Sequence, residues 1–170
     1  MLRFDRLTYK AQESLEKAVT IAKENFHQEI DVDHLFLGLL SIPDSLVITL
    51  LNKINVNIIA FKKDIEALIQ GKPQIKGSNL QEHISQHLQN ILEQAEKESQ
   101  KMGDQYISVE HIFLALIKEP QSSLIEILAK HGLHKEGIEK VLKDVRGAHQ
   151  VTDQNPEGKY QSLEKYGKDL

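Results

Sequence analysis

Apolar residues near the start of the chain recur every three or four positions, which is the spacing of one face of an α-helix. The stripe follows Thr8, a suitable N-cap because its hydroxyl can accept a first-turn N–H. It fades near Asn25. This spacing predicts an amphipathic helix between these two residues, with an inward face formed by Ala11, Leu15, Ala18, Val19 and Ala22.

The same pattern returns 77 residues later. Residues 8–70 align with residues 85–147 without a gap, and seventeen of the sixty-three aligned pairs are identical. Ser85 takes the place of Thr8, and the most similar stretches are 30–40 and 107–117. A repeat of this length indicates one folded unit that is present twice.

Each unit contains three further predicted helices. A short, strongly apolar helix begins near Asp33 or Glu110 and ends before Pro43 or Pro120. A third helix covers about 45–54 and 122–131 and is ended by Asn55 or Gly132. A fourth covers about 57–70 and 134–146 and precedes Gly71 or Gly147. The expected inward stripe of this fourth helix is Ile58, Phe61, Ile65 and Leu68 in the first unit, and Ile138, Leu142 and Val145 in the second.

The predicted fold class is therefore all-α. A unit of about sixty residues buries too little apolar surface alone, so we expect two pseudo-twofold-related four-helix repeats packed as one domain over residues 1–147. The connector 72–79 is expected to be an exposed loop. Residues 148–158 have almost no apolar side chains and predict a flexible linker, followed at 159–170 by the start of another module.

Bulk composition restricts the function. The chain is 40% hydrophobic and 27% charged, with a net charge of −4 and no basic cluster, which argues against nucleic-acid binding. No apolar run is long enough to cross a membrane. There is no cysteine and no secretory signal, so we expect a cytoplasmic protein.

Catalytic motifs are missing from the sequence. It contains no phosphate-binding loop, no nucleophile elbow and no dinucleotide fingerprint, so it predicts no enzyme activity and no cofactor. The histidine pairs 83/87 and 131/134 lack a third metal ligand, so no metal site is expected. Two readings remain open for the carboxylate–histidine pairs at 33–34 and 110–111. Either the carboxylate caps its helix and the histidine is incidental, or the carboxylate is a surface group that meets a peptide or a guanidinium.

Several segments resemble the Clp family. The opening Phe4-Asp5-Arg6-Leu7-Thr8, the segment from Gly103 to His111 and the duplicated four-helix layout are similar to the Clp N-terminal domain. Residues 151–157 and 163–170 are similar to the linker of the ClpB disaggregases, one branch of that family, in which an AAA+ ATPase module follows.

The resemblance implies a substrate-recruiting module of an ATP-dependent disaggregase. Such proteins are hexamers that thread aggregated polypeptide through a pore and cooperate with the Hsp70 chaperone system. ATP and Mg²⁺ would bind beyond residue 170, and this part alone is expected to be a monomer. Unfolded or aggregated protein would bind in an apolar groove along the fifth helix. The implied binding residues are Thr8, Leu88, Ile91, Leu92, Asp104, Glu110 and His111.

An alternative follows from the ClpC-type unfoldases of the same family, whose N-terminal domains take adaptors and phosphoarginine at two repeat-related acidic positions. Asp33 and Glu110 fall at those positions. The groove also has polar neighbours here, because Gln94, Glu98 and His111 stand where leucine can occur.

Overall fold

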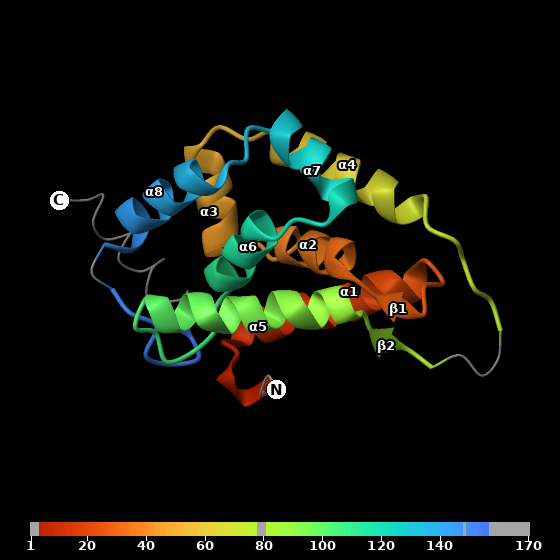
Figure 1. The fold of residues 1–170 in the computed structure, drawn as a ribbon, viewed down its shortest axis with the longest axis horizontal. Helices are drawn as coiled ribbons and strands as arrows, with labels where there is room; N and C mark the ends of the chain where they lie inside the picture. Colours follow the sequence, from red (N-terminus) through yellow and green to blue (C-terminus); the bar gives the residue numbers. More distant parts are fainter. Residues whose placement is uncertain (1–3, 78–80, 148, 157–170) are drawn as a thin grey trace.

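The computed structural model describes residues 4–77, 81–147 and 149–156, and within these ranges it contains eight α-helices and two very short strands (Figure 1). The prediction of an all-α fold is confirmed. The elements in chain order are η1 (Phe4–Arg6), α1 (Tyr9–Glu24), β1 (Glu29–Ile30), α2 (Val32–Leu40), α3 (Leu46–Lys53), α4 (Ile58–Gln70), β2 (His83–Ile84), α5 (Gln86–Lys101), α6 (Val109–Lys118), α7 (Ser122–Lys130) and α8 (Lys135–Arg146).

Helix boundaries follow the local chemistry that the sequence indicated. Thr8 Oγ1 accepts the N–H of Ala11 at 3.2 Å, and Ser85 Oγ accepts the N–H of Leu88 at 2.9 Å. The third helix of each unit is followed by a left-handed residue, with φ of 62° at Asn55 in the first unit and a glycine in the second. Equivalent caps therefore fix equivalent ends in both repeats.

The two repeats share one interior. Helices α2 and α6 contact each other at the centre, while α3 packs on α8 and α4 packs on α7 (Figure 1). The repeat-equivalent rings of Phe36 and Phe113 meet edge to face with 5.9 Å between centroids. Each pairing joins one repeat to the other, as a pseudo-twofold axis requires.

Short strand pairings also join the repeats. Ile30 pairs with Ile84 in the parallel β1–β2 sheet, and Leu7 forms an isolated parallel bridge with Ile107. Adding 77 to Leu7 and Ile30 gives Ile84 and Ile107, so the two bridges are equivalent by the repeat. The residue shortly before the first helix of each repeat, Leu7 or Ile84, therefore pairs through its backbone with the other repeat.

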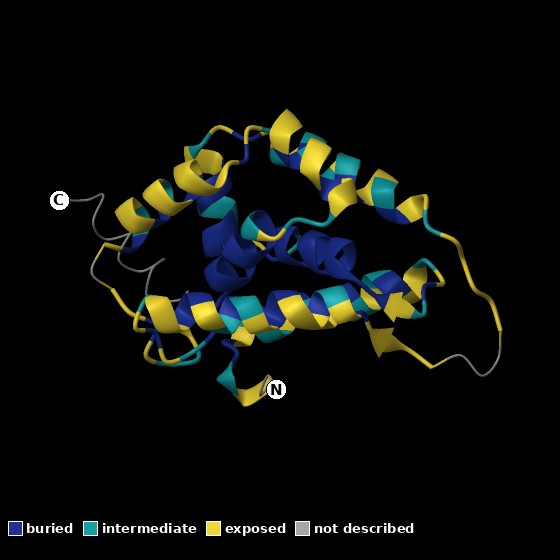
Figure 2. Ribbon diagram, viewed as in Figure 1, coloured by how far each residue is buried: buried dark blue, intermediate teal, exposed yellow. Residues whose placement is uncertain are grey.

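Burial explains the strongly apolar stretches of the sequence. Every residue of α2 is buried, whereas the outer helices bury one stripe (Figure 2). In α4 the predicted burial of Phe61 and Ile65 is confirmed, but Ile69 completes the fully buried stripe and Leu68 is only partly buried. The buried stripe of α4 keeps a four-residue spacing from Phe61 through Ile65 to Ile69. Its last member is therefore one residue later than the predicted Leu68.

Residues 149–156 pack back onto the domain, within the range 148–158 for which the sequence predicts a flexible linker. The Val151 side chain is fully buried, its N–H donates to Asp104 Oδ1 at 2.8 Å, and its carbonyl accepts the N–H of Gln105 at 2.8 Å. Further along, the Gln154 carbonyl accepts the N–H of Tyr9 at 2.9 Å. Residue 148 and the predicted module start at 159–170 lie outside the described residues.

Candidate functional site

An apolar groove of about 530 Å³ lies between α1 and α5. Leu15 of α1 and Leu92 of α5 are repeat-equivalent, and so are Glu16 and Glu93 at its rim. The groove therefore straddles the pseudo-twofold axis, and neither repeat could form it alone. Its apolar lining consists of Phe4, Leu15, Val19, Ile30, Ile84, Leu88 and Leu92.

Two of the predicted groove residues lie where the resemblance implied. Leu88 and Leu92 line the groove, but Ile91 points into the core and is buried there. Gln94 and Glu98 do not line it, because Glu98 is buried against α6 and its Oε1 accepts Lys118 Nζ at 2.7 Å and Gln94 Nε2 at 3.2 Å. These polar substitutions leave the apolar lining intact.

Sequence reasoning missed the other wall of the groove. The helical spacing predicts Leu15 and Val19 in the inward stripe of α1, yet both are only partly buried and face the groove. Neither Phe4 nor Ile84 is among the predicted groove residues, although these residues remain 53% and 42% exposed. An apolar residue between polar neighbours, as at Ile84, was the available signal.

A buried polar cluster lies at the start of α2. Asp31 is the N-cap, and His34 Nδ1 accepts its N–H at 2.9 Å in a reciprocal capping box. The His34 proton therefore lies on Nε2, 2.9 Å from Nδ1 of His27. Asp33 is fully buried and pairs with Lys72 Nζ at 2.7 Å. The first residue of the predicted exposed connector thus serves as a buried carboxylate's counter-ion.

The equivalent cluster at the start of α6 has different chemistry. His111 Nδ1 accepts the N–H of the N-cap Ser108 at 2.9 Å, so its Nε2–H points at Asp104 Oδ2, 2.6 Å away. The buried Arg146 guanidinium holds both oxygens of Asp104, at 2.7 and 2.8 Å. Glu110 is fully buried beside them, with Ser108 Oγ on one carboxylate oxygen.

One half of the first reading holds, because Asp33 Oδ1 accepts the first-turn N–H of His34 at 2.9 Å, and the rest of both readings is corrected. The histidines are not incidental, because each is the reciprocal cap of its helix. Asp33 and Glu110 are not surface groups, because both side chains are buried among their own partners. Thr8 is likewise buried as the cap of α1. The polar residues implied by the resemblance are therefore buried within the fold, whereas the groove is open to solvent.

Charge states differ between the two clusters. Burial lowers the pKa of His34 to about 4, against the opposing field of Asp33, so this ring is neutral at pH 7. Burial alone would raise the pKa of Asp104, but hydrogen bonds from His111 and Arg146 outweigh it and hold that pKa at about 2. One cluster therefore contains neutral rings where the other contains a carboxylate–guanidinium pair.

Metal and membrane sites receive no support from the part of the chain that the structure describes. Residues 4–77, 81–147 and 149–156 contain no group of three or more His, Asp or Glu side chains placed to hold a metal ion. No helix in the same ranges has the length and apolarity needed to cross a bilayer.

Comparison with known proteins places this fold. The chain is 39% identical over 169 residues to "Chaperone protein ClpB" of Bacillus cereus, covering 98% of this chain and 19% of the relative. The structure is similar to the Hsp104 N-terminal domain from Candida albicans, with a TM-score of 0.78, 20% identity, and coverage of 89% of this chain and 98% of that one. A complex of the ClpV N-domain with a VipB peptide gives a TM-score of 0.65 at 20% identity, covering 82% and 86%.

The matching region also agrees with a family model. Residues 6–131 match the model described as "Clp repeat (R) N-terminal domain", and they include all of repeat one and most of repeat two. The chain spans about a fifth of the length of the ClpB relatives it matches. From the matched residues and the duplicated helical fold, we conclude that the chain belongs to the family of Clp repeat N-terminal domains.

Proposed function

We propose that the chain recruits substrate for an ATP-dependent protein disaggregase by binding unfolded or aggregated polypeptide in the groove between α1 and α5. The observation that carries this proposal is the open apolar lining shared by both repeats. Exposed apolar surface of this kind marks binding sites for partner polypeptide. A ClpV N-domain of the same fold has been captured with a peptide, which supports this class of ligand.

The acidic rim of the groove indicates which polypeptide segments it would prefer. Glu16 and Glu93 border the groove on opposite helices. Their charges would attract a basic residue that lies next to an apolar one. A few apolar side chains buried at about 1.5–3 kcal/mol each, less the cost of ordering them, give weak binding. On this proposal ATP, Mg²⁺, hexamer assembly and the Hsp70 system act through modules beyond residue 170, where several copies would add avidity.

Recognition of adaptors or phosphoarginine at Asp33 and Glu110 receives less support from this geometry. Both carboxylates are fully buried, and Lys72 already neutralises Asp33. A guanidinium would have to displace that ion pair and open the start of α2. Free phosphoarginine therefore serves as the competing ligand in the test below.

The groove is tested by NMR titration of this chain with a permanently unfolded protein, reduced and carboxymethylated α-lactalbumin. We expect shifts around Ile84, Leu88 and Leu92, and Ile84→Lys should weaken binding by about tenfold or more, since it places a charge in the apolar lining. Ile59→Lys is the matched control, because Ile59 is 70% exposed on α4 and does not line the groove. Equal loss in both variants, or shifts confined to the Asp33 and Glu110 regions with phosphoarginine alone, would refute the proposal.

A further inference from the structure

Gln154 shows how this fold holds a passing chain segment, because it binds the stretch before α1 through both of its amide groups. Its backbone carbonyl accepts the N–H of Tyr9 at 2.9 Å. Its side-chain Nε2 lies 3.3 Å from the carbonyl oxygen of Leu7 and 3.2 Å from that of Asp5. One glutamine thus satisfies one backbone donor and two backbone acceptors.

The direction of the backbone explains why these three groups are available. Along an extended chain the polar groups of successive residues point to opposite sides. The Arg6 carbonyl and the Thr8 N–H face Ile107, at 2.8 and 2.9 Å, in the parallel bridge between the repeats. The three groups that Gln154 binds belong to the alternate residues. They therefore form an edge that faces away from the bridge, where another segment can pair with it.

Repeat two has the same edge before α5. The three counterparts, 77 residues later, are the carbonyl groups of Glu82 and Ile84 and the N–H of Gln86. Between them, the Ser85 N–H faces the other repeat and donates to the Ile30 carbonyl at 3.0 Å. All three counterparts belong to exposed residues, and within the described ranges no residue forms a hydrogen bond with these groups. The second edge thus has the geometry of the first without its glutamine.

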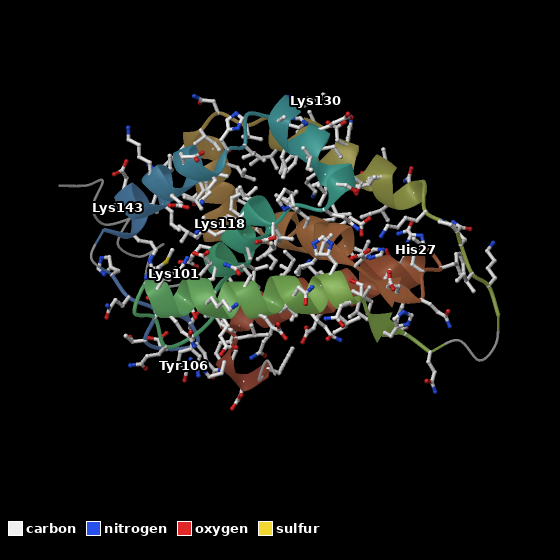
Figure 3. The ribbon with its side chains drawn as sticks, in the orientation of Figure 1. His27, Lys101, Tyr106, Lys118, Lys130 and Lys143 are labelled. Atoms are coloured by element: carbon white, nitrogen blue, oxygen red, sulfur yellow. The ribbon has the colours of Figure 1, made fainter. Side chains whose placement is uncertain are left out.

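This second edge adjoins the groove between α1 and α5. Ile84 belongs to both, since its backbone forms the edge and its side chain lines the groove. The edge that Gln154 occupies lies beside the labelled Tyr106, whereas the second lies beside β1, close to the labelled His27, towards the other end of the molecule (Figure 3). Residues 149–156 therefore leave the second edge accessible to a segment that lies in the groove.

Building on the proposed function, we propose that the edge at Ile84 and Gln86 is a glutamine subsite of the substrate groove. The backbone carbonyl of a substrate glutamine accepts the Gln86 N–H, and the two hydrogens of its side-chain NH₂ are donated to the carbonyl groups of Ile84 and Glu82. Apolar neighbours of that glutamine lie against the groove lining at Ile84 and Leu88. The groove thereby selects extended segments in which a carboxamide side chain stands beside apolar residues.

The side-chain part of the proposal is tested by NMR titration of this chain with two capped pentapeptides, Lys-Leu-Gln-Leu-Ser and Lys-Leu-Met-Leu-Ser. Methionine is similar in length to glutamine, lacks the amide donor and is more apolar, so a groove that recognises only apolar surface would bind the methionine peptide more tightly. We expect the opposite order, with the glutamine peptide at least about threefold tighter and shifts at the Ile84 and Gln86 amides.

Gln86→Pro tests the backbone donor. Gln86 is the first residue of α5, where proline is favoured, and Ser85 before it has φ −65° and ψ 155°, a conformation that a following proline allows. The matched control, Gln86→Ala, also removes the side chain but keeps the N–H. The proline variant should bind the glutamine peptide at least about threefold more weakly than the alanine variant does.

The outcomes separate the subsite from the groove. Methionine-peptide affinity equal to or above that of the glutamine peptide, or equal affinities of Gln86→Pro and Gln86→Ala, would overturn the subsite while shifts at Leu88 and Leu92 still support groove binding. The absence of shifts at Leu88 and Leu92 with either peptide would contradict both proposals. If Gln86→Pro does not fold, the order of the two peptides decides the question.

Discussion

At the scale of single residues, the two repeats use one histidine for the same structural task in different electrostatic settings. His34 and His111 both accept the N-cap N–H through Nδ1 and direct Nε2–H at the residue seven positions earlier. That residue is histidine in repeat one and aspartate in repeat two. The duplicated cap therefore gives two clusters that respond to acid in separate pH ranges.

The first consequence is a loss of stability in mild acid. The folded-state pKa of His34 is about 4, below the 6.5 expected in the unfolded chain. Unfolded molecules therefore bind more protons below pH 6.5, and stability falls as the pH drops from about 6.5 to 4. We expect urea unfolding at pH 5 to show about 2 kcal/mol less stability than at pH 7.5 from this group.

His34→Gln provides the control, because glutamine at this position of a capping box accepts the N-cap N–H without titrating. The variant should lose most of the difference between pH 7.5 and 5. Asp104 is an acid, not a base, but its lowered pKa of about 2 also makes the folded state less stable as the pH falls. Its contribution is present above about pH 3.8 and is lost as the pH falls through 2. An unchanged pH 5 to 7.5 difference in His34→Gln would contradict the assignment.

At the scale of elements, the α1–α2 contact depends on one glycine. A Cβ on Gly38 would lie 2.5 Å from the backbone oxygen of Ser14, which cannot move without shifting α1. Gly38→Ala should therefore destabilise the domain by about 1–3 kcal/mol, measured as the free energy of unfolding in urea. In repeat two the equivalent residue is Ala115, so α5 and α6 already accommodate this methyl group.

Gly137 in α8 is the matched control for that substitution. It is exposed, and a Cβ there would meet no atom within 4 Å. Gly137→Ala should stabilise the protein by about 0.5–1 kcal/mol through helix propensity. Destabilisation by both alanine variants would show that a general effect of the added methyl group, and not the α1–α2 approach, explains the Gly38 result.

Helix positions were predictable because each end carries a local signal. Thr8 and Ser85 cap α1 and α5, and Asn55 adopts the left-handed conformation after α3. Because the unit is repeated, each helix boundary could be predicted twice, once in each half of the sequence. The capping role of His34 was not predictable, because the side chain usually found at that position of a capping box is glutamate or glutamine. A histidine beside a carboxylate suggests surface chemistry unless its burial is known.

At the scale of the whole molecule, the groove depends on how the repeats dock. Leu15 and Leu92 occupy the same place in their units and meet across the pseudo-twofold axis. Periodicity within one helix cannot separate a side chain that faces the core from one that faces such a shared groove. For this reason Leu88 and Leu92 could be named from the resemblance, whereas Leu15 could be identified as a groove residue only from the three-dimensional fold.

The packing of residues 149–156 onto the domain could not be predicted from the sequence, for a related reason. Residues 149–156 contain a single strongly apolar anchor, Val151, and the segment is otherwise held through polar and backbone groups. Polar composition predicted a solvated linker, because the acceptor for the Val151 N–H comes from Asp104, forty-seven residues earlier. The structure instead fixes the direction in which the chain leaves the domain.

This docking gives the final prediction. Val151→Asp would bury a carboxylate in a fully enclosed position next to Asp104, so the segment should detach while the helices remain folded. Hydrogen exchange should then lose protection at the Gln105 and Val151 amides and keep it in the interior of α1. Thr152→Asp adds the same charge at the next, exposed residue and should leave both amides protected. Retained protection of the Gln105 N–H in Val151→Asp would mean that Val151 is not the anchor. Its loss would show that one apolar side chain and one carboxylate together set the exit path of the chain from the domain.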